Sequence, residues 1–150
     1  MTAAEKFQAL LHTHTKYNAE AYNFIYEALD WTLKHVVHKL EGMIRHVTGQ
    51  ELCEGFRQHA IEQFGCMALT VLEGWNIFST DDVGSIIFNL IEFDLMAKQE
   101  TDSRVDFKKV FNFEEEFTLL PQCSFDNDTQ EWEIKYSKRP KKKRMASDKK

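Results

Sequence analysis

The sequence predicts a mainly α-helical protein with three parts: a single compact helical domain over residues 1–118, a short strand-containing extension over residues 119–136, and a disordered basic tail over residues 137–150. Three observations support this division. Apolar residues recur at helical spacing through most of the first hundred positions. Near the C-terminus, Glu131–Tyr136 (EWEIKY) alternates charged with apolar or aromatic residues, as a strand does. The last 14 residues are too polar to form a core.

Two helices are expected before residue 41. Ala3–Thr13 places Phe7 and leucines on one side, and a polar stretch follows it. A longer helix begins at about Asn18 and could run to about Leu40, with a break expected around Val36–His38 because this length is near the upper end of ordinary helices.

The next helix carries the clearest start signal in the chain. Thr48 is an N-cap residue, and Glu51 stands three residues later, as a capping box requires. Apolar residues then recur every fourth position until Gly65, a typical C-terminal glycine. The pattern predicts one continuous helix over this stretch.

A helix-turn-helix follows in the predicted order. Met67–Trp75 is a short helix, Asn76–Phe78 a turn, and Thr80–Ala97 a longer helix capped by Ser79 or Thr80. With wing strands from Phe107–Phe111 and Trp132–Tyr136, the arrangement would be a winged helix. The alternative is that Thr80–Ala97 is simply a core helix.

The charges of this segment disfavour DNA reading. A recognition helix brings its N-terminal residues to base edges and uses Lys and Arg on phosphates. Here Asp81 and Asp82 stand at the helix start, and no Lys or Arg occurs between Arg57 and Lys98. We therefore expect the helix to pack rather than to read DNA. A winged-helix transcriptional regulator stays as an alternative function.

Charge divides the chain sharply. Residues 1–136 carry 11 Lys and Arg against 23 Asp and Glu, a net charge of -12, whereas residues 137–150 carry eight against one, a net charge of +7. The basic tail could bind a nucleic-acid backbone, an anionic surface or an acidic protein, or could merely solubilise the chain. Aromatic residues beside it could stack on single-stranded bases. The candidate polyanion-binding residues are Lys138, Arg139, Lys141, Lys142, Lys143 and Arg144, with Trp132 and Tyr136 as stacking candidates.

Catalytic and metal-binding motifs are weak. His35 and His38 share a helix face, but a zinc site needs three or four converging ligands. Cys66 follows a glycine at a helix junction, where a thiol pKa can fall. The three cysteines, an odd number, favour buried thiols in a reducing compartment. An enzyme or metal protein using His35, His38 or Cys66 is the second alternative; no cofactor is expected.

Three segments resemble a known family. These are AYNFIYEALDW (Ala21–Trp31), HVTGQELCEGFRQHAIEQFG (His46–Gly65) and VGSIIFNLIE (Val83–Glu92). They are similar to a small family of uncharacterised bacterial proteins from planctomycete and verrucomicrobial genomes, over about residues 17–117. The resemblance implies a bacterial cytoplasmic protein and brings no activity, cofactor or site.

The sequence as a whole favours a non-enzymatic, cytoplasmic binding or adaptor protein. Its acidic helical body would meet an unidentified protein partner, and its basic tail would contact RNA, for example on a ribosome, or another polyanion. No apolar run approaches the roughly 20 residues needed to cross a bilayer, so no membrane partner is expected. The oligomeric state is left open.

Overall fold

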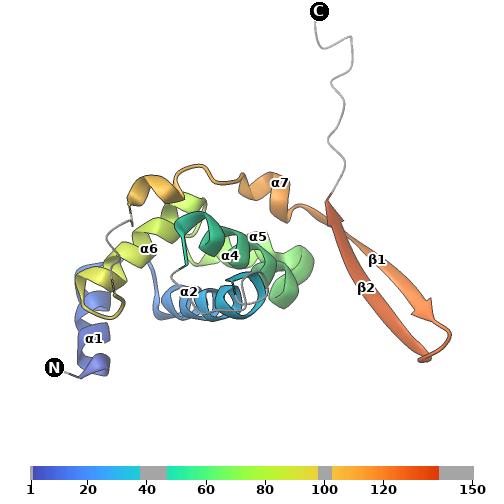
Figure 1. Cartoon of the computed structure of the whole chain (residues 1–150), viewed down its shortest axis with the longest axis horizontal. Coiled ribbons are helices and arrows are strands. Elements are labelled where there is room, and N and C mark those ends of the chain that lie inside the picture. The colour runs from blue at the N-terminus through green and yellow to red at the C-terminus, as the bar shows by residue number, and fades with distance from the viewer. Residues whose placement is uncertain (1, 38–46, 98–102, 139–150) are drawn as a thin grey trace, which may run out of the picture.

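The computed structural model describes residues 2–37, 47–97 and 103–138. It is a mainly helical single domain from which a two-stranded β-hairpin projects (Figure 1). In chain order the elements are α1 (Ala3–Thr13), α2 (Ala19–Thr32), a π-helical turn η1 (Leu33–Val37), α4 (Gly49–Phe64), a 3₁₀ turn η2 (Gly65–Met67), α5 (Ala68–Gly74), α6 (Thr80–Glu92), a 3₁₀ turn η3 (Arg104–Phe107), α7 (Phe113–Phe117), β1 (Leu119–Asp126) and β2 (Glu131–Lys138).

The local start signals of the helices are confirmed. The Thr48 hydroxyl accepts from the Glu51 backbone N–H at 3.1 Å, and the Glu51 carboxylate accepts from the Thr48 backbone N–H at 3.0 Å. A second capping box joins Thr2 to Glu5 at the start of α1. Gly65 ends α4 with a φ of +53°, which only glycine adopts readily. The predicted break at Val36–His38 falls partly outside the described residues.

The core lies where α2 crosses α4 and α6. Phe24 sits at its centre, with its ring 5.1 Å from that of His59 and 5.6 Å from that of Phe56. Gly55 permits the close approach of α2 to α4, because an added Cβ would overlap the side chain of Thr32. The turn after α5 adds the ring of Trp75, whose centroid lies 5.5 Å from that of Phe24.

Helix α6 is shorter than predicted, ending at Glu92 rather than Ala97. Asp94 has a φ of +56°, and the Leu95 N–H bonds back to the Leu90 carbonyl at 2.9 Å, which is the Schellman pattern of a helix end. The turn lets Leu95 pack back on the core. The apolar residues that suggested a longer helix are therefore core residues of the turn that follows it.

The predicted strand at Phe107–Phe111 is wrong. Phe107 instead ends the 3₁₀ turn η3, and Lys109 turns the chain with a φ of +47°. Phe107 is buried because its side chain packs closely over Gly84 of α6 and meets the ring of Phe88 edge-on. The strand expected at Glu131–Tyr136 is confirmed as β2, and its partner β1 was not anticipated.

Candidate nucleic-acid interface

The hairpin has one apolar and one polar face. Strands β1 and β2 pair antiparallel so that Phe125 lies opposite Trp132, Cys123 opposite Ile134 and Pro121 opposite Tyr136. Since side chains alternate along a strand, these six residues share one face. We call them the apolar face of the arm, the arm being Leu119–Lys138.

The apolar face is largely open to solvent. Trp132 is 71% exposed and Ile134 is 56% exposed, against 40% for Phe125 and 38% for Tyr136. The rings of Phe125 and Trp132 meet edge-on with centroids 5.3 Å apart. Figure 1 shows that the arm extends away from the helices, so its outer half has no helix beneath it. Exposed aromatic rings on a pair of strands are a surface on which unpaired bases can stack.

The base of the arm is fixed to the helical body. The ring of Tyr136 lies against Gly65, where an added Cβ would overlap it. The Lys138 ammonium donates to the Glu116 carboxylate at 2.8 Å, and Arg57 lies 3.7 Å from the same carboxylate. Arg57 also donates from Nε to Glu54 at 2.9 Å. These contacts orient the last residue of β2, from which the basic tail continues in sequence.

The structure places part of the predicted site on one face of the arm. Trp132, Tyr136 and Lys138 lie on the same face of β2, because they stand at alternate positions. The other predicted cations, Arg139, Lys141, Lys142, Lys143 and Arg144, lie outside the described residues. Sequence reasoning missed Phe125, although alternate residues of Leu119–Asp126 are apolar, which is a strand signal.

The acidic start of α6 is structural. Asp82 is buried and accepts hydrogen bonds from the Tyr17 hydroxyl, from Lys16 Nζ at 3.1 Å and from the Phe78 backbone N–H at 2.8 Å. Burial would raise the pKa of Asp82, but these hydrogen bonds together hold it below its ordinary 3.8. Burial and the Asp82 carboxylate raise the pKa of the Tyr17 phenol in turn.

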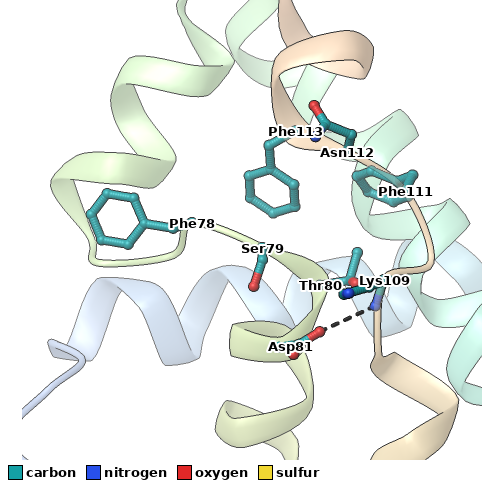
Figure 2. Close-up of a pocket in the computed structure, with 8 residues that line it drawn as sticks. All are labelled: Phe78, Ser79, Thr80, Asp81, Lys109, Phe111, Asn112 and Phe113. Atoms are coloured by element: carbon teal, nitrogen blue, oxygen red, sulfur yellow. Dashed lines mark hydrogen bonds between the residues drawn. The ribbon is translucent and has the colours of Figure 1, made fainter.

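A shallow pocket of about 480 Å³ lies beside the same helix start (Figure 2). Asp81 accepts from the Lys109 backbone N–H at 3.2 Å, and the fully buried Thr80 accepts from the Val110 N–H at 3.1 Å. Figure 2 shows Asn112 and Phe113 entering from the segment that crosses above the helix start. The polar groups here hold that segment, and Thr80 and Asp82 in the first turn of α6 are buried, whereas a recognition helix needs its first turn open to DNA.

The other candidate residues do not converge. The ring of His35 stacks on Trp31 with centroids 4.2 Å apart, and its Nδ1 lies 3.0 Å from the Trp31 carbonyl oxygen, while His38 lies outside the described residues. Within the described ranges, no three His, Cys, Asp or Glu side chains are grouped as metal ligands. The expectation of buried thiols holds for Cys53 but is wrong for Cys66 and Cys123, which are exposed.

Among the described residues, no helix combines the length and the hydrophobicity that a membrane crossing requires. Comparisons of the chain with protein-family models, with curated proteins and with solved structures found no match. The resemblance to a bacterial family therefore stays a prediction, and function has to be argued from the arm and from charge.

Proposed function

We propose that this chain is a non-enzymatic, cytoplasmic binding protein whose arm and basic tail bind single-stranded RNA. One observation carries the proposal: a projecting strand pair with exposed aromatic residues leads directly into six cations within seven residues. Stacking of a base on an aromatic side chain contributes about 1–3 kcal/mol, whatever the base. Cations beside such a surface neutralise the phosphates that link the bases.

The charge distribution directs RNA to this end of the molecule. Residues 1–118 carry a net charge of -9 and residues 119–136 a net charge of -3, so phosphates are repelled from the body and are attracted by the tail, whose net charge is +7. Lys138 shares a face with Trp132 and is the first cation of the tail. A strand of RNA that stacks on Trp132 and runs along this face past Tyr136 would reach Lys138 and the tail after about 20 Å. Duplexes gain less from the arm because their bases are already stacked on each other.

The dependence of RNA affinity on salt separates the contribution of the cations from the contribution of base stacking. A labelled single-stranded RNA is titrated with full-length protein over a salt series, and binding is followed by fluorescence anisotropy. Replacing Arg139, Lys141, Lys142, Lys143 and Arg144 with Gln should make the log–log salt slope shallower by about 3 to 4, since each lost contact on single strands contributes roughly 0.7. Trp132→Ala should weaken binding by roughly 5- to 100-fold with an unchanged slope.

The matched control is Phe78→Ala. Phe78 is an aromatic residue of the body that is 54% exposed, so its removal deletes similar exposed apolar area outside the arm. We expect RNA affinity to be unchanged in that variant. Equal losses from Trp132→Ala and Phe78→Ala, or a five-residue tail variant with the parent's salt slope, would contradict the proposal.

A further inference from the structure

We propose that two copies of this chain pair through β2, antiparallel and about a two-fold axis, to form the four-stranded sheet β1-β2-β2′-β1′. In the part of the chain that the structure describes, β2 pairs with β1 alone, and every residue of β2 is exposed. A two-stranded hairpin is marginally stable by itself, and an open edge strand is a template for a further strand. The described residues of the helical body contain no such strand, whereas a second copy supplies one.

Pairing through β2 rather than β1 follows from Pro121. Proline has no N–H to donate and is found in sheets on edge strands. Pro121 stands in the third position of β1, so β1 is suited to remain the outer strand. The edge of β2 contains no proline.

The side chains of β2 specify one register. With Ile134 opposite the partner's Ile134, each Trp132 faces the partner's Tyr136 on the apolar side. On the polar side, each Glu133 then faces the partner's Lys135. The two-fold axis makes every such pair occur twice.

Neighbouring registers are unfavourable. Moving the axis by one residue toward the N-terminus places Glu133 against the partner's Glu133, and moving it the other way places Lys135 against the partner's Lys135. Directly opposed like charges destabilise a sheet. Only the register centred on Ile134, among these three, joins opposite charges at both positions.

These charges are unmatched within one copy. In the hairpin Glu133 lies opposite Ser124, and Lys135 lies opposite Gln122. Neither Glu133 nor Lys135 makes an ion pair with another residue in the described ranges. The second copy therefore supplies the complementary charge that the first lacks.

The hairpin tips do not repel each other in this arrangement. Glu131 lies directly opposite Asp126, and Asp128 stands in the turn between them, so three carboxylates lie near one end of the arm. In the proposed register Glu131 lies opposite the partner's Ser137, so the two acidic tips are at opposite ends of the four-stranded sheet. The paired sheet keeps its apolar face open, and the pairing does not depend on RNA binding.

Charge exchange tests the register. Self-association of the full-length protein, without RNA, is measured by sedimentation equilibrium. Glu133→Lys and Lys135→Glu each turn two attractive pairs into repulsive ones and should weaken dimerisation roughly tenfold or more. The double variant restores opposite charges and should recover the dimer. Glu114→Lys, an equal charge change at an exposed site on α7, should leave dimerisation unchanged.

Disulfide cross-linking tests whether the two-fold axis passes through Ile134. In a background with Cys66→Ser and Cys123→Ser, Ile134→Cys should form a disulfide-linked dimer under mild oxidation, because paired Cα atoms lie within the range that disulfides span. Ser137→Cys in the same background should not, since the two copies of residue 137 would lie about 20 Å apart. A monomer at all concentrations, a dimer insensitive to charge exchange, or equal cross-linking at both positions would overturn the proposal. Because no RNA is present, failure here leaves the RNA titration unaffected.

Discussion

Replacing Asp82 with Asn should destabilise the fold more than any other single-atom change at the start of α6. Asp82 joins the loop before α2, through Lys16 and Tyr17, to the turn before α6, through the Phe78 backbone N–H. Its carboxylate is buried, so water cannot replace those partners. Asn keeps the shape of the side chain but removes the charge and one acceptor oxygen.

The expected loss is about 2–3 kcal/mol in the free energy of unfolding. A hydrogen bond to a charged group contributes about 1.5–3 kcal/mol, and the buried bond from Tyr17 and the partly buried bond from the Phe78 N–H weaken together. Lys16 adds only about 0.5 kcal/mol, because its side chain is 62% exposed and an exposed ion pair is weak. The neighbouring Asp81→Asn is the control: it removes a similar charge from the same helix end, but from an exposed side chain, and should cost below about 1 kcal/mol.

Urea denaturation followed by circular dichroism measures both variants, at one fixed protein concentration because self-association would also shift stability. The pKa of Asp82 is lowered in the folded state, so its contribution is complete above the unfolded pKa near 4 and is lost as pH falls through the folded pKa. The gap between parent and Asp82→Asn should therefore be constant from pH 5 to 7 and shrink toward pH 3. Equal costs for the two variants, or a gap that widens on acidification, would refute this reasoning.

Three further predictions concern packing and reactivity. Gly55→Ala should destabilise by about 1–3 kcal/mol through overlap with Thr32, whereas Gly74→Ala, with no atom within 4 Å of the added Cβ, should stabilise slightly; thermal unfolding of both measures this. Burial raises the pKa of the Cys53 thiol to about 12, so a thiol reagent at pH 8 should label two cysteines quickly and Cys53 only on unfolding; three fast thiols would contradict the burial. Both ring nitrogens of His59 are buried without a hydrogen-bond partner among the described residues, and the Glu27 carboxylate lies 3.9 Å from Nε2. His59→Phe should therefore be neutral or stabilising in urea denaturation, and a loss above about 1 kcal/mol would show that the contact with Glu27 stabilises the fold.

Elements whose signals are local were predictable from the sequence. The capping box of Thr48 and Glu51 and the stop at Gly65 each depend on residues within a few positions of each other. The alternation in Glu131–Tyr136 likewise predicted β2. The proposal that β2 is part of a binding surface came from composition, because charged and aromatic residues are adjacent in this sequence.

Elements fixed by distant contacts were not predictable in the same way. The end of α6 depends on Leu95 returning to the core, and apolar spacing cannot distinguish that from another helical turn. Phe107 looked like a strand residue because its packing against Gly84 of α6 leaves no periodic signal. Phe125 joined the candidate site only once the register placed it beside Trp132.

The helical body contains the core that stabilises the fold, whereas the arm contains the proposed binding surface. Large core side chains such as Tyr22 and Phe56 are fully buried within the helical part, whereas Leu119 is the one buried residue of the arm, which the structure describes in full. Loss of Trp132 or a charge exchange at Glu133 therefore removes little native packing, so those variants should stay folded and report on binding alone. Asp82, in contrast, stabilises the fold, because its carboxylate near the start of α6 accepts hydrogen bonds from the Tyr17 hydroxyl and the Phe78 N–H. The negative charges of α6 thus stabilise the body and repel phosphates, which is why we propose the arm and the basic tail, rather than α6, as the surface for a polyanion and for a second copy.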